Sequence, residues 1–279
     1  MKEHTRNMPG LFFEKMHGLG NDFVLIDARQ QPMPSRDTIV AMADRHTGIG
    51  FDQLVVLTGS NPVFMDIYNQ DGSKAEACGN VTRCAADLLA RDGEPFPMNI
   101  QTTGGLLTID AIGPHYRVNM GKPKRAFDEI PFLGSGTGKI GEGVITSFHD
   151  VPSLRAYLVN MGNPHMVLFG DASSLHHAES WGPHLSIHPS FPEGVNVGFA
   201  HICSQNQLRL RVHERGAGVT LACGSGACAA VVAAIDAGLV TPGLITVETD
   251  GGCLQIEYQG HEVMMTGPAS RVFSGIWHG

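Results

Sequence analysis

An internal repeat constrains the fold of this 279-residue chain more than any other feature of its sequence. Residues 77–80 read Ala-Cys-Gly-Asn and residues 222–225 read Ala-Cys-Gly-Ser, at an offset of about 145 residues. Upstream of these segments, Gly20-Asn21 and Gly162-Asn163 each stand before an apolar run. A repeat of this length exceeds the period of solenoid proteins, so it indicates two duplicated domains.

Each half of the chain contains mostly strand-like segments and one strong helix. Short apolar or alternating runs, bounded by turn-forming residues, predict the strands. These strands cover residues 23–27, 54–57, 63–68, 106–109 and 116–120 in the first half, and residues 155–159, 166–169, 195–200, 207–212, 245–248, 254–258 and 263–266 in the second. Helices are predicted at residues 37–44, 82–91 and 227–238.

We therefore expect an α/β (α+β) fold with two pseudo-symmetric domains. Residues 1–11 are predicted to form a disordered N-terminal tail. The first domain is expected to cover residues 12–123, with residues 268–279 returning to it, and the second to cover residues 124–267. A stretch rich in Gly, Pro and charge near residues 122–143 is predicted to link the two domains.

The composition excludes several classes of protein. Hydrophobic residues make up 42% of the chain, which is enough for a sizeable core and excludes disorder for most of it. A net charge of -8 without any basic run disfavours nucleic-acid binding. The charged N-terminal residues argue against a secretory signal, and the uncharged residues 216–235 are interpreted as a buried helix rather than a membrane span. We expect a cytoplasmic protein without nucleic-acid or membrane partners.

Two of the six cysteines stand apart from the others. No metal-binding array is recognisable among the cysteines and the 14 histidines, so no metal is expected. Without an export signal the thiols are expected to be reduced. Four of the cysteines are interpreted as ordinary packing residues: Cys84, Cys203, Cys228 and Cys253. Cys78 and Cys223 occupy the two matched Cys-Gly turns, each in front of a predicted helix, which favours a functional role.

A thiol at a helix N-terminus has a specific chemical use. The free backbone N–H groups and the positive end of the helix dipole are expected to lower its pKa and to bind an anion such as a carboxylate. The adjacent Gly79 and Gly224 let the backbone approach a ligand closely. If the two halves face each other, Cys78 and Cys223 flank one carbon, and one thiolate and one thiol can invert a stereocentre next to a carboxylate. A redox dithiol is the competing chemistry, but redox pairs usually lie close in sequence.

Several segments together resemble diaminopimelate epimerase, and the resemblance covers nearly the whole chain. They are Met16-His17-Gly18-Leu19-Gly20-Asn21-Asp22-Phe23, Asn69-Gln70-Asp71-Gly72-Ser73, Ala77-Cys78-Gly79-Asn80, Met161-Gly162-Asn163-Pro164-His165, Glu214-Arg215-Gly216 and Ala222-Cys223-Gly224-Ser225-Gly226. The resemblance implies an isomerase that interconverts LL- and meso-diaminopimelate without pyridoxal phosphate or any other cofactor, in lysine and peptidoglycan precursor synthesis. It also implies a homodimer, and two domains that each wrap a β-barrel-like sheet around a central helix.

The same resemblance implies roles for individual residues. Cys78 and Cys223 would be the proton-transfer thiols, tuned by His165 and Glu214. Gly79-Asn80 and Gly224-Ser225 would hold the carboxylate at the reacting end of the substrate. The remaining substrate-binding residues would be Asn21, Gln53, Asn69, Asn163, Asn196, Glu214 and Arg215. Neutral amides and a planar guanidinium suit this task, because the enzyme must read ammonium and carboxylate groups at the distal end of its substrate.

The repeat adds a hypothesis about how the two halves diverged. Asn21 aligns with Asn163, and Asn69 aligns with Glu214, so the halves would supply corresponding positions with different side chains.

One departure from the family pattern is Val81, which stands where a small residue often follows Cys-Gly-Asn. A β-branched residue disfavours positive φ, so this turn is predicted to have ordinary backbone angles.

Three alternatives remain open at this point. A proline or hydroxyproline racemase would share the fold and the paired thiols, but it would leave Arg215 without a substrate group to bind. A phenazine-pathway isomerase of the same fold is disfavoured by the presence of both cysteines. A non-enzymatic binding module would not require the thiols, so replacing Cys78 and Cys223 with alanine would leave its role intact.

Overall fold

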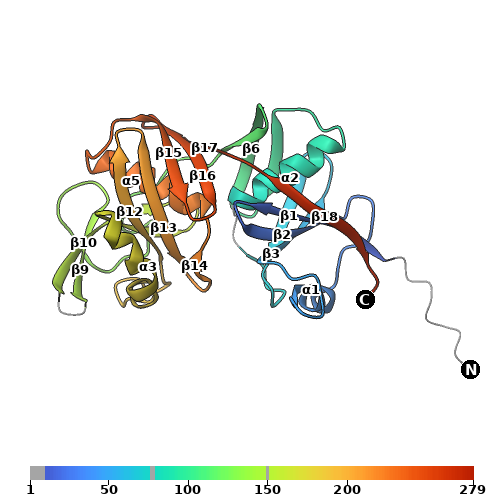
Figure 1. Ribbon diagram of the computed structural model, residues 1–279, viewed down its shortest axis with the longest axis horizontal. Coiled ribbons are helices and arrows are strands. Elements are labelled where there is room, and N and C mark those ends of the chain that lie inside the picture. Colours follow the sequence, from blue (N-terminus) through green and yellow to red (C-terminus); the bar gives the residue numbers. More distant parts are fainter. Residues whose placement is uncertain (1–9, 76–78, 149–150) are drawn as a thin grey trace, which may run out of the picture. The chain divides into compact units, whose positions relative to one another are not determined.

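The computed structural model describes residues 10–75, 79–148 and 151–279 (Figure 1). The chain forms two compact units, unit 1 (Met1–Ala111 and Pro268–Gly279) and unit 2 (Ile112–Gly267). The expected division after residue 123 falls inside unit 2, beyond strand β7 (His115–Asn119), because β7 pairs with β17 (Val263–Gly267) of that unit.

Unit 1 builds its sheet from both ends of the sequence. Strand β1 (Leu11–Gly18) lies between β2 (Asn21–Asp27) and β18 (Ser270–Trp277) and is antiparallel to both, as Figure 1 shows. The sheet continues through β3, β4, β5 and β6 (Gln53–Thr58, Val63–Tyr68, Met98–Thr102 and Gly105–Ile112). Its helices are α1 (Arg36–Ala43) and α2 (Gly79–Arg91), and α2 packs on β1 and β2.

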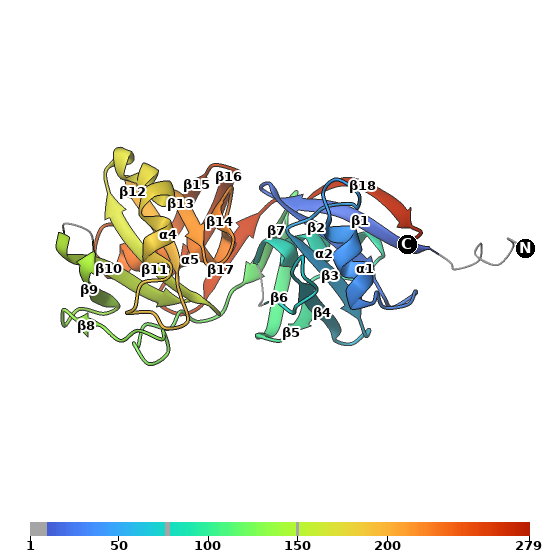
Figure 2. The ribbon, with the colours of Figure 1, turned by 90° about the horizontal axis from the view of Figure 1, so that it is seen from below.

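Unit 2 wraps its strands around one apolar helix, α5 (Gly224–Asp236), which contacts strands from β10 to β17 (Figure 2). The remaining strands are β8 to β16 (Ser135–Gly136, Glu142–Phe148, Val151–Asn160, Pro164–Gly170, Asn196–Ser204, Gln207–Glu214, Gly218–Thr220, Gly243–Thr249 and Gly252–Tyr258). Three short helical turns, η1, α3 and α4 (Ala172–His176, His177–Ser180 and Gly182–Leu185), join β11 to β12. No helix within the described ranges is long and apolar enough to cross a membrane.

The repeat in the sequence appears as a repeated strand order. In unit 1, β2 and β3 are parallel, β3 and β4 are antiparallel, and α2 then leads to β5, which is parallel to β4. In unit 2, β11, β12, β13, α5 and β15 follow the same scheme with the same directions. Helices α2 and α5 each contain 13 residues. The two units are therefore pseudo-symmetric in topology.

Strand β1 was not expected from the sequence, and its buried charges explain why. Glu14 and Lys15 are 5% and 7% exposed, so the strand lacks the alternation that marks a surface strand. Arg91 donates to the Glu14 carboxylate, and Lys15 pairs with Asp22, so both buried charges are compensated. Leu11, which was placed in the tail, pairs with Trp277. Residues 1–9 of the expected tail lie outside the described residues.

The expected linker near residues 122–143 belongs to the core of unit 2. Ile130 and Phe132 are buried in a cluster with Phe191 and with the strands that surround it. The segment also contains β8, which pairs with β9. Glycine and proline were read as signs of a linker, but here they shape a loop that folds back onto the apolar core.

Candidate active site

Cys223 lies at the first turn of helix α5, at the position where the repeat predicts a reactive thiol. It is the N-cap residue, with an extended backbone (φ -117, ψ 112), and its exposed fraction is 4%. Gly226 approaches it closely, because a Cβ at this glycine would lie 3.2 Å from the cysteine sulfur. The backbone N–H of Gly226 and the Ser225 hydroxyl both interact with the thiol and favour its ionised form.

A buried hydrogen-bonded cluster connects this thiol to strand β11. The Ser225 hydroxyl lies 3.7 Å from the Cys223 sulfur and 3.0 Å from Nε2 of His165. The same ring nitrogen lies 2.9 Å from Oδ1 of Asn163. Burial, and secondarily the positive charge of Arg215, lowers the pKa of His165 to about 3. His165 is therefore a neutral imidazole at physiological pH, and it orients its neighbours without carrying charge.

Glu214 ends strand β13 beside the same thiol. Its Oε1 accepts a hydrogen bond of 2.6 Å from the hydroxyl of Thr220, on the short neighbouring strand β14. Burial, together with the negative charge of Glu214, raises the pKa of Cys223 well above its ordinary value. The expectation of a lowered pKa at this helix N-terminus was wrong for Cys223. The hydrogen bonds from the first turn of α5 do favour the thiolate, but desolvation outweighs them.

Asn196, the first residue of β12, hydrogen-bonds to Arg215, which directly follows β13. The Asn196 side chain donates to the carbonyl oxygen of Pro164 (3.1 Å) and accepts from the backbone N–H of Arg215 (2.8 Å). The guanidinium of Arg215 donates to the carbonyl oxygen of Glu193 (2.7 Å). Unit 2 thus gathers its predicted site residues around the N-terminus of α5: Asn163, His165, Asn196, Glu214, Arg215, Cys223, Gly224 and Ser225.

Unit 1 brings Asn21 and Asn80 together in the corresponding region. Oδ1 of Asn21 accepts a hydrogen bond of 3.3 Å from Nδ2 of Asn80, at the first turn of α2. Nδ2 of Asn21 donates to Oδ2 of Asp52 at 2.8 Å. Gly79 begins α2, and Cys78, which precedes it, lies outside the described residues. Val81 is buried in the same turn without positive φ, which confirms the prediction of ordinary backbone angles there.

A charged network next to Asn21 supports these residues of unit 1. Arg45 donates to the carboxylates of Asp22 (2.8 Å) and Asp52 (2.9 Å), and Lys15 pairs with Asp22. Burial alone raises the pKa of Asp22, but the hydrogen bonds from Arg45 and Lys15 outweigh it and lower that pKa to about 2. Asp22 is therefore ionised at physiological pH.

The strand registers relate Gln53 and Asn69 to unit 2. Gln53 pairs with Phe23 on β2, and Asn196 pairs with His165 on β11. Asn69 directly follows the pair Leu54–Tyr68, and Glu214 directly follows the pair Val197–His213. These registers place Gln53 at the position of Asn196, and Asn69 at the position of Glu214. The side chain of Asn69 also donates to the Ser73 hydroxyl (3.1 Å) within its own turn.

Three residues of this region were not singled out in the sequence: Asp52, Arg83 and Thr220. Asp52 acts on Asn21 from 31 residues away, whereas Arg83 and Thr220 act on Asn80 and Glu214 from three and six residues away, and no local pattern marks these contacts. Among the described residues, no group of three or more His, Cys, Asp or Glu side chains could hold a metal ion.

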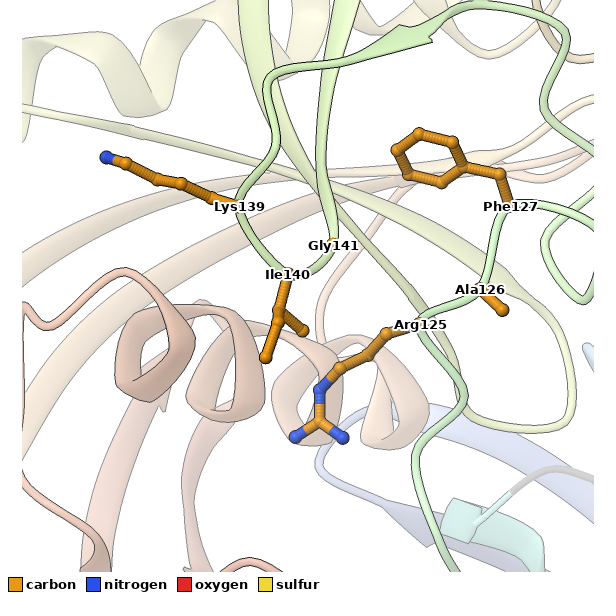
Figure 3. Close-up of a pocket in the computed structure, with 6 residues that line it drawn as sticks. All are labelled: Arg125, Ala126, Phe127, Lys139, Ile140 and Gly141. Atoms are coloured by element: carbon orange, nitrogen blue, oxygen red, sulfur yellow. The ribbon is translucent and has the colours of Figure 1, made fainter.

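A separate hollow of about 370 Å³ lies on unit 2 between residues 125–127 and 139–141 (Figure 3). Arg125 extends from one wall, where it pairs with Asp236 of α5, and Lys139 extends from the other. None of the predicted site residues lines this hollow.

Comparison with known families decides which of the predicted relationships holds. The family model described as diaminopimelate epimerase matches residues 13–126 and 157–272. The chain belongs to the diaminopimelate epimerase family. A diaminopimelate epimerase of Gluconobacter oxydans (strain 621H) is 47% identical over 95% of this chain and 98% of that protein. The family member from Neisseria meningitidis serogroup A is 43% identical over 96% of this chain and 98% of that protein.

Solved structures of low sequence identity share the fold of this diaminopimelate epimerase family member. A hydroxyproline epimerase from Agrobacterium vitis superposes with a TM-score of 0.67 at 14% identity, over 97% of this chain and 94% of that one. A phenazine biosynthesis protein of the PhzF family from Enterococcus faecalis gives a TM-score of 0.64 at 14% identity, over 96% and 98% of the two chains. These structures confirm the predicted fold class, and their low identities carry no argument about substrate.

Proposed function

We propose that this protein is a pyridoxal-phosphate-independent epimerase that interconverts LL- and meso-diaminopimelate. Its place would be the cytoplasmic synthesis of lysine and peptidoglycan precursors. The family match over nearly the whole chain carries this proposal. The position of Cys223 supports it, because a buried thiol beside a carboxylate at a helix N-terminus suits proton transfer next to a substrate carboxylate.

The reaction needs one thiolate and one thiol on opposite faces of the α-carbon. Cys78 and Cys223 fill these roles in the proposal. The raised pKa of Cys223 means that its resting form is the protonated thiol, so Cys78 is the base in the direction in which Cys223 donates its proton. In the reverse direction Cys223 becomes the base. The Gly226 N–H and the Ser225 hydroxyl favour the thiolate of Cys223, which forms when Cys223 donates its proton and is the base in the reverse direction.

The substrate is recognised by side chains that distinguish ammonium from carboxylate. Asn80 and Ser225, with Gly79 and Gly224, would hold the carboxylate at the reacting end through the first turns of α2 and α5. The planar guanidinium of Arg215 suits the distal carboxylate. Neutral and acidic side chains would bind the ammonium groups and complete the pocket: Asn21, Gln53, Asn69, Asn163, Asn196 and Glu214.

Deuterium incorporation tests the activity directly. The enzyme is incubated in D₂O with LL-diaminopimelate and, separately, with L-proline. We expect deuterium at Cα of diaminopimelate and none in proline. Exchange into proline alone would instead support the alternative, a proline or hydroxyproline racemase. The variants Cys78→Ala and Cys223→Ala are each expected to lose measurable epimerisation, whereas a binding module would tolerate both changes.

We also propose that the protein works as a homodimer. Phe12 on β1 pairs with Ile276 on β18, and these two side chains and Val272 are 46%, 56% and 56% exposed. An apolar strip of this kind on a soluble protein favours association. Light scattering of the purified protein is expected to give the mass of two chains, and Ile276→Lys to shift it towards one. A monomer at all concentrations would contradict the proposal.

A further inference from the structure

A chain of hydrogen bonds in unit 1 runs from a buried cation to an anion through two amides. Nη2 of Arg83 donates to Oδ1 of Asn80 (3.1 Å), and Nδ2 of Asn80 donates to Oδ1 of Asn21 (3.3 Å). Nδ2 of Asn21 then donates to Oδ2 of Asp52 (2.8 Å). The other oxygen of Asp52 accepts from Arg45 (2.9 Å). The four side chains therefore form one head-to-tail series.

The two ends of this series dictate the direction of everything between them. A guanidinium can only donate hydrogen bonds, and an ionised carboxylate can only accept them. Asn80 must therefore turn its oxygen to Arg83, and Asn21 must turn its nitrogen to Asp52. If the Asn80 amide flipped, its NH₂ group would face the donor Arg83. If the Asn21 amide flipped, its oxygen would face the Asp52 carboxylate. Both amide orientations, which are otherwise interchangeable in shape, are fixed by Arg83 and Asp52.

Arg83 is buried and is held in place by backbone acceptors. Its exposed fraction is 0%, and it also donates to the carbonyl oxygens of Pro268 (3.0 Å) and Gly79 (3.3 Å). Gly18, at the end of β1, makes room for it, because a Cβ there would lie 3.1 Å from Nη2 of Arg83. A fully buried guanidinium is costly unless several acceptors surround it, so these contacts help to retain the charge beside Asn80.

In unit 2 the corresponding polar side chains are oriented by different residues. The fifth residue of α5 is Cys228, whereas the fifth residue of α2 is Arg83. In unit 2 the neutral imidazole of His165 contacts both Asn163 and Ser225, the counterparts of Asn21 and Asn80. The counterpart of His165 in unit 1 is the buried Phe23, whose side chain cannot form hydrogen bonds. Unit 1 therefore depends on Arg83 and Asp52 for a task that one histidine performs in unit 2.

We propose that Arg83 and Asp52 are positioning residues that set the amide orientations of Asn80 and Asn21 for substrate binding. This inference rests on the proposed function, in which both amides bind diaminopimelate. Either end alone dictates the same direction for both amides. Losing one end therefore removes one of these constraints on the amide directions, and losing both ends removes both.

Steady-state kinetics of Arg83→Met, Asp52→Asn and the double variant test this role. We expect KM for diaminopimelate to rise roughly threefold in each single variant. In the double variant we expect a rise of roughly a hundredfold, well above the product of the single effects. Arg83→Lys keeps the charge but not the planar fork, so its KM is expected to lie between those of the wild type and Arg83→Met.

Matched controls separate positioning from stability. Arg29→Met removes an arginine of unit 1 that pairs with Asp27, and Asp66→Asn removes a carboxylate that pairs with Lys74. Both controls, and their double variant, are expected to keep the wild-type KM even where melting temperatures fall. Asp52 is partly exposed, so Asp52→Asn is expected to fold even if Arg83→Met does not, and Asp52→Asn with Arg83→Gln, which removes the charge but keeps a polar side chain, then replaces the double variant.

The outcomes distinguish this inference from the proposed function. If the wild-type enzyme places no solvent deuterium at Cα of diaminopimelate, the proposed function fails. If the wild type is active but the double variant shows only the product of the single effects, or KM follows the melting temperature in all variants, the positioning role of Arg83 and Asp52 is overturned. A rise in KM above that product, with unchanged controls, supports it.

Discussion

The Ser225 hydroxyl lies 3.0 Å from Nε2 of His165 in the interior of unit 2. Because the same hydroxyl is 3.7 Å from the sulfur of Cys223, one serine joins the thiol to a neutral imidazole. Glu214 also interacts with the thiol, and it and Ser225 affect the pKa of Cys223 in opposite ways. Their substitution therefore separates the two influences on the acidity of Cys223.

Ser225→Ala is expected to raise the pKa of Cys223 further. The hydroxyl interacts with the thiol and favours its ionised form, and alanine removes that interaction. The pH midpoint of Cys223 alkylation, measured in a Cys78→Ala background, should move upward, and the epimerisation rate should fall roughly tenfold in an otherwise wild-type enzyme. Ser204→Ala, at an exposed serine of β12, serves as the control and should change neither quantity.

Glu214→Gln is expected to shift the same midpoint in the opposite direction. The Glu214 carboxylate raises the pKa of Cys223, second only to burial, and glutamine removes the charge at nearly constant shape. Alkylation of Cys223 should therefore become faster at neutral pH while epimerisation becomes slower. An unchanged or higher midpoint would show that Glu214 does not act on the thiol.

Asp22→Asn is expected to destabilise the protein at neutral pH but not in strong acid. The folded state lowers the pKa of Asp22 from 3.8 to about 2, so its ion pairs stabilise the folded state above pH 3.8 and are lost as the pH falls through about 2. The variant should lose roughly 2 kcal/mol of unfolding free energy near pH 7. Urea unfolding at several pH values measures this difference, which should shrink towards zero near pH 2. A constant difference would contradict the assignment.

His165→Phe is expected to make the protein less sensitive to mild acid. The folded state lowers the pKa of His165 from 6.5 to about 3, so the unfolded chain binds the extra proton first. The folded state therefore loses stability as the pH falls from 6.5 towards 3. Phenylalanine is accommodated at the counterpart position, Phe23, so the variant should fold. Melting temperatures between pH 7 and pH 4 should fall less steeply in the variant than in the wild type.

Gly226→Ala is expected to impair catalysis through the position of Cys223. The added Cβ would lie 3.2 Å from the sulfur and 3.1 Å from Val212, so the thiol must shift by a few tenths of an ångström. Since small displacements of reacting groups slow an enzyme strongly, we expect kcat to fall roughly tenfold with little change in KM. Gly238→Ala is the control, because this glycine lies after the C-terminus of α5, at the opposite end of the helix from the thiol; its φ of 70° means that alanine is expected to lower stability there but not kcat. Wild-type kcat in Gly226→Ala would argue against close packing at the thiol.

The sequence alone identified the elements that carry the site, but not all of their boundaries. Helices α2 and α5 each begin three residues earlier than predicted, at Gly79 and Gly224. Glycine, asparagine and serine are poor helix formers, so intrinsic propensity places the start too late. Packing of these first turns against the sheet overrides that propensity. The position of the Cys-Gly pair in front of a helix was nevertheless recognisable, because the repeat presents it twice.

Contacts between distant segments were beyond the reach of sequence patterns. Asp52 acts on Asn21 from 31 residues away, and Asn80 reaches Asn21 from 59 residues away. Thr220, which donates to Glu214, looks in sequence like any strand threonine. The raised pKa of Cys223 was also missed, since a dipole argument counts the helix but not the desolvation around it. Burial and partner identity exist only after folding, so they could not be read from local residue order.

Strand β18 follows the whole of unit 2 in the sequence yet completes the sheet of unit 1 beside β1. During translation, residues 112–267 are therefore synthesised in full before the ribosome has made the strand that covers β1. Unit 2 can reach its native state while unit 1 still exposes an unpaired strand edge. Synthesis of unit 1 begins first but is completed last, so the nascent N-terminal half stays aggregation-prone until β18 has been made.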